Sequence, residues 1–142
     1  MKVTGAFTID GDADLVFTMF DPEGEARWAP GWEIDPVFPI PFRPETNAVF
    51  RVTNDGQIEV WSMLDFNPRE RKVEYLATAG TDLVRRVAVS CMPAGGRTEV
   101  NVTYVLTSLS PAGAARAAAF NGDYITGWRE LVQAAVDKLR TH

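Results

Sequence analysis

The sequence has one histidine and one cysteine, and this scarcity excludes several kinds of catalytic site. The histidine is His142, the last residue, which leaves no Ser-His-Asp triad, no Cys-His pair and little histidine-based acid–base chemistry. Zinc and iron sites rely largely on the same two residue types. Carboxylates alone could hold a hard cation, but no calcium-loop spacing occurs. We therefore expect no metal site and no cofactor.

The chain also lacks the usual features of exported and membrane proteins. Cys91 has no second cysteine to pair with, which favours a reducing compartment. The apolar runs are well short of the roughly twenty residues that a membrane span needs. The first residues lack the basic start and apolar stretch of a signal peptide. These observations predict a cytoplasmic protein with no membrane span.

Basic residues are fewer than acidic ones. There are 14 Lys and Arg against 19 Asp and Glu, for a net charge of −5, and residues 10–35 hold eight acids and one base. No basic stripe is present, so we expect no nucleic-acid partner. An acidic segment of this kind is more often a solvated face than a binding site.

What the chain does contain is a long amphipathic stretch at its C-terminal end. Apolar residues recur three and four positions apart over residues 112–142, which predicts one long helix with one apolar face. The apolar positions are Ala117, Phe120, Tyr124, Ile125, Trp128, Leu131, Val132, Ala135, Val136 and Leu139. Gly122 and Gly127 fall inside the stretch. We interpret them as close-approach points or a bend, because the apolar pattern continues through both.

The preceding hundred residues predict a sheet on which this helix packs. Turn signals and alternating apolar residues indicate a strand at residues 2–9, two short helices ending near Ala29, and five meandering strands. The five strands are residues 48–54, 57–66, 71–78, 82–92 and 97–108, with Asn54-Asp55-Gly56 as the first turn. This order predicts an α+β helix-grip fold, in which a curved antiparallel sheet of about six strands wraps around the C-terminal helix. Residues 1–142 are expected to form a single domain.

A proline-rich segment lies between the short helices and the meander. Residues 30–45 contain five prolines, a density that excludes a helix or a central strand. The segment also carries large apolar residues such as Trp32 and Phe38. We therefore expect it to lie on the body of the protein and either close the core or cover a cavity.

Three short motifs are distinctive. They are the run Asp-Pro-Glu-Gly-Glu-Ala-Arg-Trp-Ala-Pro-Gly-Trp at residues 21–32, the Val60-Trp61 pair in a strand, and Leu-Thr-Ser-Leu-Ser at residues 106–110 before a helix that contains glycine. With the order of elements, they resemble the START-like superfamily, also called SRPBCC or helix-grip, and the first motif resembles a small bacterial branch of it. This superfamily includes polyketide cyclases/dehydrases, lipid-transfer domains and the Hsp90-ATPase-activator-like group. The resemblance implies a deep, mostly apolar cavity between sheet and long helix.

Aromatic residues and two arginines are the candidates to line such a cavity. The ligand-binding candidates are Trp28, Trp32, Phe38, Trp61, Tyr75, Arg85, Arg86, Tyr104, Phe120, Tyr124 and Trp128. A mostly apolar wall with a few polar groups is typical of small-molecule sites. Taken singly, each aromatic residue is more often part of a core than of a ligand wall. No catalytic residue is assigned.

Arg85 and Arg86 are adjacent in a strand, so one of them must face the helix side of the sheet. A charged side chain there is almost never buried unpaired. The inward arginine would either anchor an anion or carbonyl group in the cavity, pair with an acid of a neighbouring strand, or reach water at the sheet edge. Val87, Val89 and Cys91 share a face with Arg85, which slightly favours Arg85 as the inward residue without deciding the choice.

Three functions are compatible with these features. The first is binding of a small hydrophobic or amphipathic molecule, such as a lipid, a polyketide or an aromatic metabolite. The second is a polyketide cyclase/dehydrase-like enzyme that uses Tyr, Arg and carboxylate groups. The third is a protein-interaction module of the Hsp90-ATPase-activator-like kind. The lack of a catalytic His or Cys favours the first.

Two further features leave alternatives open. Glu23, Glu25 and Arg27 would either gate the cavity mouth or interact only with solvent and the helix dipole. Residues 57–66 have two fairly apolar faces, so this strand is either covered on both sides or lies at a homodimer contact.

Overall fold

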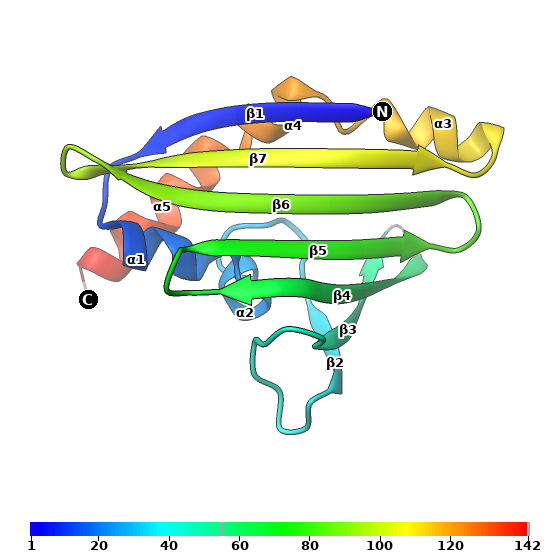
Figure 1. Ribbon diagram of the computed structural model, residues 1–142, viewed down its shortest axis with the longest axis horizontal. Helices are drawn as coiled ribbons and strands as arrows, with labels where there is room; N and C mark the ends of the chain where they lie inside the picture. Colours follow the sequence, from blue (N-terminus) through cyan, green and yellow to red (C-terminus); the bar gives the residue numbers. More distant parts are fainter. Residues whose placement is uncertain (55, 142) are drawn as a thin grey trace.

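The computed structural model describes residues 1–54 and 56–141, and it shows a curved antiparallel sheet with helices on one face (Figure 1). Within these residues the sheet has seven strands, in the order β1-β7-β6-β5-β4-β3-β2. The strands are β1 (Lys2–Ile9), β2 (Ile34–Phe38), β3 (Val49–Asn54), β4 (Gln57–Asn67), β5 (Lys72–Ala79), β6 (Leu83–Ala94) and β7 (Arg97–Ser108). Neighbours from β2 to β7 follow one another in the chain, so the predicted meander is confirmed. Asp55, in the predicted turn between β3 and β4, and His142 lie outside the described residues.

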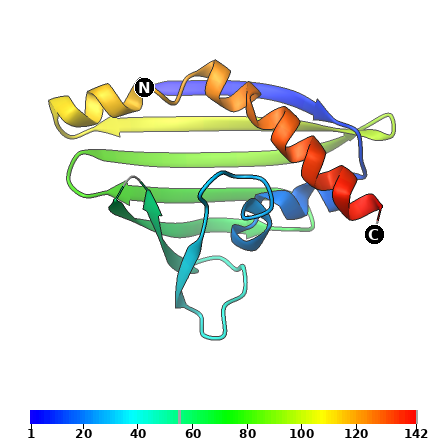
Figure 2. The ribbon, with the colours of Figure 1, turned by 180° about the vertical axis from the view of Figure 1, so that it is seen from behind.

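Helical segments cover the concave face of this sheet, and the longest of them crosses it obliquely (Figure 2). The segments are α1 (Ala13–Phe17), the short 3₁₀ turn η1 (Thr18–Phe20), α2 (Pro22–Glu25), α3 (Pro111–Ala117), α4 (Gly122–Thr126) and α5 (Trp128–Arg140). The core lies between α5, the segments after β1, and the inward side chains of the strands. The α+β helix-grip architecture is confirmed.

The C-terminal helix is not continuous from Ala112, as the apolar spacing predicted. Asn121 has an extended backbone, and its side chain accepts a hydrogen bond from the backbone N–H of Tyr124, so it ends the preceding turn and caps α4. Gly122 is the first residue of α4, and a Cβ there would meet nothing within 4 Å, so it is not a close-approach point. Gly127 keeps helical dihedral angles and joins α4 to α5. The gripping helix is therefore α5.

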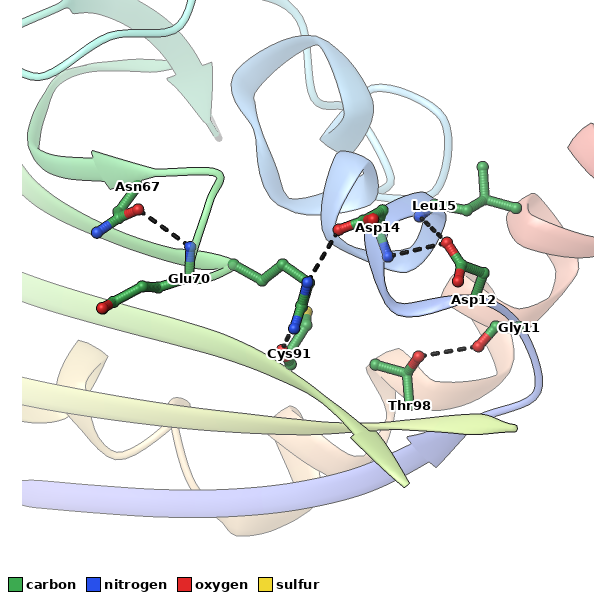
Figure 3. A network of polar contacts seen from close by, with 9 residues as sticks. Gly11, Asp12, Asp14, Leu15, Asn67, Glu70, Cys91 and Thr98 are labelled. Atoms are coloured by element: carbon green, nitrogen blue, oxygen red, sulfur yellow. Dashed lines mark hydrogen bonds and ion pairs between the residues drawn. The ribbon is translucent and has the colours of Figure 1, made fainter. Parts of the chain in front are cut away.

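Side-chain caps set where the first helix begins and tie it to the sheet (Figure 3). The carboxylate of Asp12 accepts hydrogen bonds from the backbone N–H groups of Asp14 and Leu15. Arg71 donates to the carboxylate of Asp14 at 3.1 Å and to the carbonyl oxygen of Cys91 at 3.3 Å. These contacts join α1 to β6 and to the turn before β5.

The segment after α2 is held against the helices by two indole groups. Asp21 caps α2 and Pro22 is its first residue, as the Asp-Pro pair predicts. The indole N–H of Trp28 donates to the carbonyl oxygen of Met19 at 2.7 Å, and that of Trp32 donates to the carbonyl oxygen of Pro22 at 2.8 Å. Both rings are therefore fixed in place before any ligand arrives.

The proline-rich segment lies only partly on the body of the protein. Its first part forms the edge strand β2, which pairs with β3 alone, and Trp32 and Phe42 pack against the core. Phe38 and Ile40 are mostly exposed, and the chain after β2 projects away from the sheet (Figure 1). The prediction that this segment lies on the body is therefore confirmed for Trp32 and Phe42 and wrong for Phe38 and Ile40.

The outer face of β4 has no cover from the residues that the structure describes. Ile58 and Val60 are 59% and 44% exposed there. Of the two alternatives for this strand, cover on both sides is therefore not what the structure has. A homodimer contact at this face stays a prediction.

Candidate ligand-binding cavity

A cavity of about 750 Å³ lies between the concave face of the sheet, helices α4 and α5, and the loop that follows α2. Its inner wall includes Trp61 and Tyr104, which are buried. Exposed residues such as Gly31, Asn54 and Asp123 also line it, and they mark where the cavity reaches the surface. A volume of this size is within the usual range for small-molecule sites, about 300–1,000 Å³.

Most of the candidate residues from the sequence lie together on this wall. Those that line the cavity are Trp28, Trp32, Trp61, Tyr75, Arg85, Tyr104, Tyr124 and Trp128. Three candidates are placed elsewhere. Phe38 is exposed on the edge strand, Arg86 points to the outer face and pairs with Glu74, and Phe120 packs behind the wall against Tyr104. Contact between the eight lining residues and a ligand remains a prediction.

Small residues on the central strand make room for this wall. Ala77 on β5 is opposite Trp61 on one side and Arg85 on the other, and its side chain is fully buried. A methyl group occupies little of the space above the sheet. The larger side chains of β4 and β6 can therefore extend over it and face each other.

Arg85 is the buried arginine, and it is bound to a buried acid. Its Nη2 lies 2.5 Å from Oε2 of Glu59, and the two side chains are 4% and 2% exposed. The indole N–H of Trp61 also donates to Glu59, at 3.3 Å, and Nη2 of Arg116 lies 3.6 Å from the same carboxylate. The guanidinium carbon lies 5.1 Å from the ring centroid of Trp61 and 4.7 Å from that of Phe120, so the cation is held between two rings. Arg85 thus both pairs with an acid of a nearby strand and lines the cavity.

Glu25 is a second acid on the cavity wall. Of Glu23, Glu25 and Arg27, which the sequence placed either at the cavity mouth or in solvent, only Glu25 lines the cavity, and the other two are exposed. Burial against the apolar wall, and then the charge of Asp21, raise the pKa of Glu25 well above its ordinary value. Within residues 1–54 and 56–141 its carboxyl group has no ion-pair or hydrogen-bond partner. The signal for it was helical spacing, since Trp28 and Ala29 lie three and four residues later and also line the cavity.

Glu59 is the acid on the wall that sequence reasoning missed. It alternates with Trp61 and Met63 along β4, so a period of two already places it on the inward face. A charged residue on that face indicated a partner, and the partner is Arg85, which lies two strands away in the sheet.

The three tyrosines on the wall remain protonated at neutral pH. Burial raises the pKa of Tyr75 well above its usual range, and the charge of Glu25 adds to this effect. Burial likewise raises the pKa of Tyr104 and of Tyr124. The Tyr75 hydroxyl donates to the carbonyl oxygen of Phe20 at 2.6 Å, which fixes its ring. These hydroxyls therefore act in the cavity as neutral polar groups.

The raised pKa of Glu25 predicts a pH-dependent contribution to stability. Between the ordinary glutamate pKa and the raised value, the folded protein holds a proton that the unfolded chain has released, so the free energy of unfolding falls as pH rises through this range. Glu25→Gln removes that loss. We expect it to raise the free energy of unfolding near about pH 7 by more than about 0.5 kcal/mol, the usual limit for a surface substitution, and to change it little near about pH 4.

Urea unfolding of wild type and variant at both pH values measures this difference. Glu23→Gln is the matched control, because Glu23 is on the same helix and exposed. Equal effects of the two substitutions at neutral pH would show that burial of Glu25 does not lower the free energy of unfolding.

The described part of the chain has no group of three or more His, Cys, Asp or Glu side chains placed to hold a metal ion. Among its helices, none is both long enough and apolar enough to span a membrane.

Comparison with known proteins identifies the fold. No protein-family model matches the chain, and no curated protein gives a significant sequence match. Solved structures do match. Protein MLL2253 from Mesorhizobium loti has a TM-score of 0.76 and 16% identity, over 97% of this chain and 98% of that chain. Ara h 8.0201 has a TM-score of 0.73 and 12% identity, over 97% of this chain and 98% of its own.

An enzyme is also among the matches. Norcoclaurine synthase from Thalictrum flavum has a TM-score of 0.69 and 10% identity, over 100% of this chain and 87% of the enzyme. The same enzyme in complex with dopamine and hydroxybenzaldehyde has a TM-score of 0.68. The chain therefore has the START-like helix-grip fold that the sequence motifs predicted.

Proposed function

We propose that the protein binds one small hydrophobic or amphipathic molecule, such as an aromatic metabolite, a polyketide or a lipid, in the cavity beneath α5. The observation that carries this proposal is a volume of about 750 Å³ with a largely aromatic wall. The aromatic residues that line it are Trp28, Trp32, Trp61, Tyr75, Tyr104, Tyr124 and Trp128. An interior of this kind is built to bury apolar surface, at roughly 25 cal/mol per Å².

The wall is also pre-formed, which favours binding over a disordered interior that must first be arranged. Trp28, Trp32 and Tyr75 each donate a hydrogen bond to a backbone carbonyl. Fixed rings lose little conformational entropy when a ligand arrives. The complex of norcoclaurine synthase with two small aromatic molecules gives an example of such binding on this fold, although a fold alone decides little about function.

Filling the cavity should abolish binding. Val87 on β6 lines the cavity and is buried, so Val87→Phe places a ring inside it. We expect this variant to weaken binding of the neutral fluorescent probe N-phenyl-1-naphthylamine by about tenfold or more, since a ligand and the new ring cannot share the space. The measurement is a fluorescence titration of the probe.

The matched control is Val105→Phe, which makes the same change on the exposed outer face of β7. It should leave the dissociation constant within about twofold, because surface substitutions rarely act at a distance. Equal binding by both variants, or no binding by the wild type, would contradict the proposed function. Native mass spectrometry of the purified protein would in addition reveal a co-purified molecule.

One observation favours an enzyme of the cyclase/dehydrase type as the second candidate. Glu25 has a raised pKa and lies on the cavity wall with Tyr75 and Tyr104, and a group of this kind suits general acid–base catalysis. This candidate requires that wild-type protein convert a molecule from a cell extract, and that Glu25→Gln bind the molecule without converting it. Mass spectrometry of the incubated extract makes that comparison.

A further inference from the structure

The charged groups on the cavity wall do not balance one another. Among the described residues, the charged side chains that line the cavity are Glu25, Glu59, Arg85 and Asp123. Arg85 pairs with Glu59 through its Nη2 at 2.5 Å, and its buried Nε has no hydrogen-bond partner among the described residues. Arg116 also approaches Glu59, but its side chain is one-third exposed, so water screens its charge. The carboxyl groups of Glu25 and Asp123 are left without a cation on the wall.

The surroundings of Glu25 contain acids and phenols. Asp21 caps the helix that carries Glu25, and its charge acts on Glu25. Tyr75 on β5 and Tyr104 on β7 lie close enough for the charge of Glu25 to act on their hydroxyls, as does Tyr124 on α4.

The nearest arginines do not compensate Glu25. Arg27, two residues along the chain, acts on Asp21 instead, and Arg85 on β6 acts on the tyrosines. Neither contributes to the pKa of Glu25, which depends on burial and on Asp21. Among the described residues, Glu25 therefore has no cation as a partner.

Aromatic rings continue from this carboxyl group along the wall. Trp28 follows Glu25 by one helical turn, and its ring centroid lies 5.2 Å from that of Trp128. The Trp128 ring lies 6.1 Å from Tyr104 and 5.8 Å from Tyr124. The faces of such rings carry a negative potential that attracts ammonium groups. Rings and an unpaired carboxyl group on one wall provide two independent attractions for the same charge.

We propose that the molecule bound in the cavity carries a basic nitrogen, which lies as an ammonium group against Glu25 and the neighbouring aromatic faces. This inference rests on the proposed function, because it names the chemical class of the ligand of the same cavity. An anionic ligand would meet the two uncompensated carboxyl groups. A neutral ligand would exchange at most a hydrogen bond with Glu25, and it would gain little from the negative potential of the ring faces.

Binding of such a molecule is coupled to the proton on Glu25. When the nitrogen arrives already protonated, the carboxyl group releases its proton to solvent and the carboxylate pairs with the ammonium. When it arrives neutral, the proton moves from the carboxyl group to the nitrogen lone pair and no proton is released. A protonated amine should therefore release a proton on binding at any pH at which Glu25 is still protonated in the free protein, and the raised pKa of Glu25 moves that range toward neutral pH.

Three indoles of similar size but different charge test the proposal. Tryptamine is a cation, tryptophol is neutral and indole-3-acetate is an anion. Isothermal titration calorimetry near about pH 7 should give tryptamine at least tenfold tighter binding than tryptophol, with indole-3-acetate weakest. Titrations in phosphate and in Tris, which differ in ionisation enthalpy, should show release of a proton with tryptamine and none with tryptophol.

Two variants test whether the preference for tryptamine over tryptophol depends on Glu25. Glu25→Gln keeps the shape and loses the ionisable group, so the ratio of tryptamine to tryptophol affinity should fall to the smaller preference that the ring faces alone supply, and the proton release should disappear. Glu23→Gln, on the exposed side of the same helix, should keep both. Thermal melts establish that each variant is folded.

The outcomes separate this inference from the proposed function. If wild-type protein binds N-phenyl-1-naphthylamine but binds tryptophol or indole-3-acetate as tightly as tryptamine, the amine proposal is overturned and the cavity remains a binding site. Tightest binding of indole-3-acetate would point to Arg85 as an anion anchor instead. If the neutral probe fails to bind as well, the proposed function fails.

Discussion

Arg85→Met is expected to lower the free energy of unfolding by about 3–5 kcal/mol, one of the largest effects of any single substitution in this protein. The change leaves the carboxylate of Glu59 buried at 1% exposure without the guanidinium that lies 2.5 Å from it. Arg116, at 3.6 Å, compensates only in part. Urea unfolding of the wild type and variant provides the measurement.

The matched control is the next residue in the chain. Arg86 also pairs with an acid, Glu74, but its side chain is half exposed and on the outer face of the sheet. Arg86→Met should therefore change the free energy of unfolding by no more than about 1 kcal/mol, as is usual for surface pairs. Similar losses for the two variants would contradict the assignment of Arg85 as the buried partner.

Removing both members of the buried pair separates the energy of the contact from the effect of an unpaired charge. The double variant Glu59→Leu with Arg85→Met should recover much of the stability that either change loses alone, because no buried charge is left without a partner. Losses that simply add would mean that the two groups are not coupled in solution.

Gly113→Ala is expected to lower the free energy of unfolding by about 3 kcal/mol or more, through a clash with the backbone. A Cβ at this position would lie 1.8 Å from the carbonyl oxygen of Asp82, and a backbone atom cannot rotate away as a flexible side chain can. The approach is close because Leu109 donates its backbone N–H to that same carbonyl at 2.7 Å, and Ser110 donates its hydroxyl to the Asp82 carboxylate at 2.8 Å. The start of α3 is thus bound tightly to the turn before β6.

Gly122→Ala is the control for this substitution. Gly122 begins α4, and a Cβ there meets no atom within 4 Å, so alanine should stabilise the protein by about 0.4–1 kcal/mol through reduced freedom of the unfolded chain. Urea unfolding of both variants should thus give changes of opposite sign. A loss with Gly122→Ala as large as with Gly113→Ala would refute the packing described for α3.

The Glu59–Arg85 pair and the close contact at Gly113 are connected through helix α3. The pair between Glu59 and Arg85 sets the polar end of the cavity, and the contact at Gly113 sets where α3 leaves the sheet. Arg116, on α3, reaches both Glu59 and Gln57. Substitutions at the Glu59–Arg85 pair or at Gly113 should therefore change ligand binding as well as stability.

Local patterns in the chain were sufficient for most of the fold. The alternation of Val100, Val102 and Tyr104 with polar residues identified a half-buried strand, and Asp21-Pro22 identified a helix start. Such signals act between residues that are close in sequence, so they can be interpreted without knowing the rest of the molecule. The interruption at Asn121 was not predicted, because the apolar spacing stays helical on both sides of an extended cap.

The sequence by itself determined the meander from β3 to β7 and the aromatic character of the inward positions, because these depend on periodicity and turns. The edge strand β2 and the pairing of β1 with β7 came only from the tertiary structure. Only the tertiary structure decided which polar groups meet. Glu25 comes from a short helix after the first strand, Glu59 from β4 and Arg85 from β6, and no local pattern relates their distances. Curvature of the sheet brings the two acids and the arginine onto one wall, where Arg85 neutralises Glu59 and leaves Glu25 without a partner.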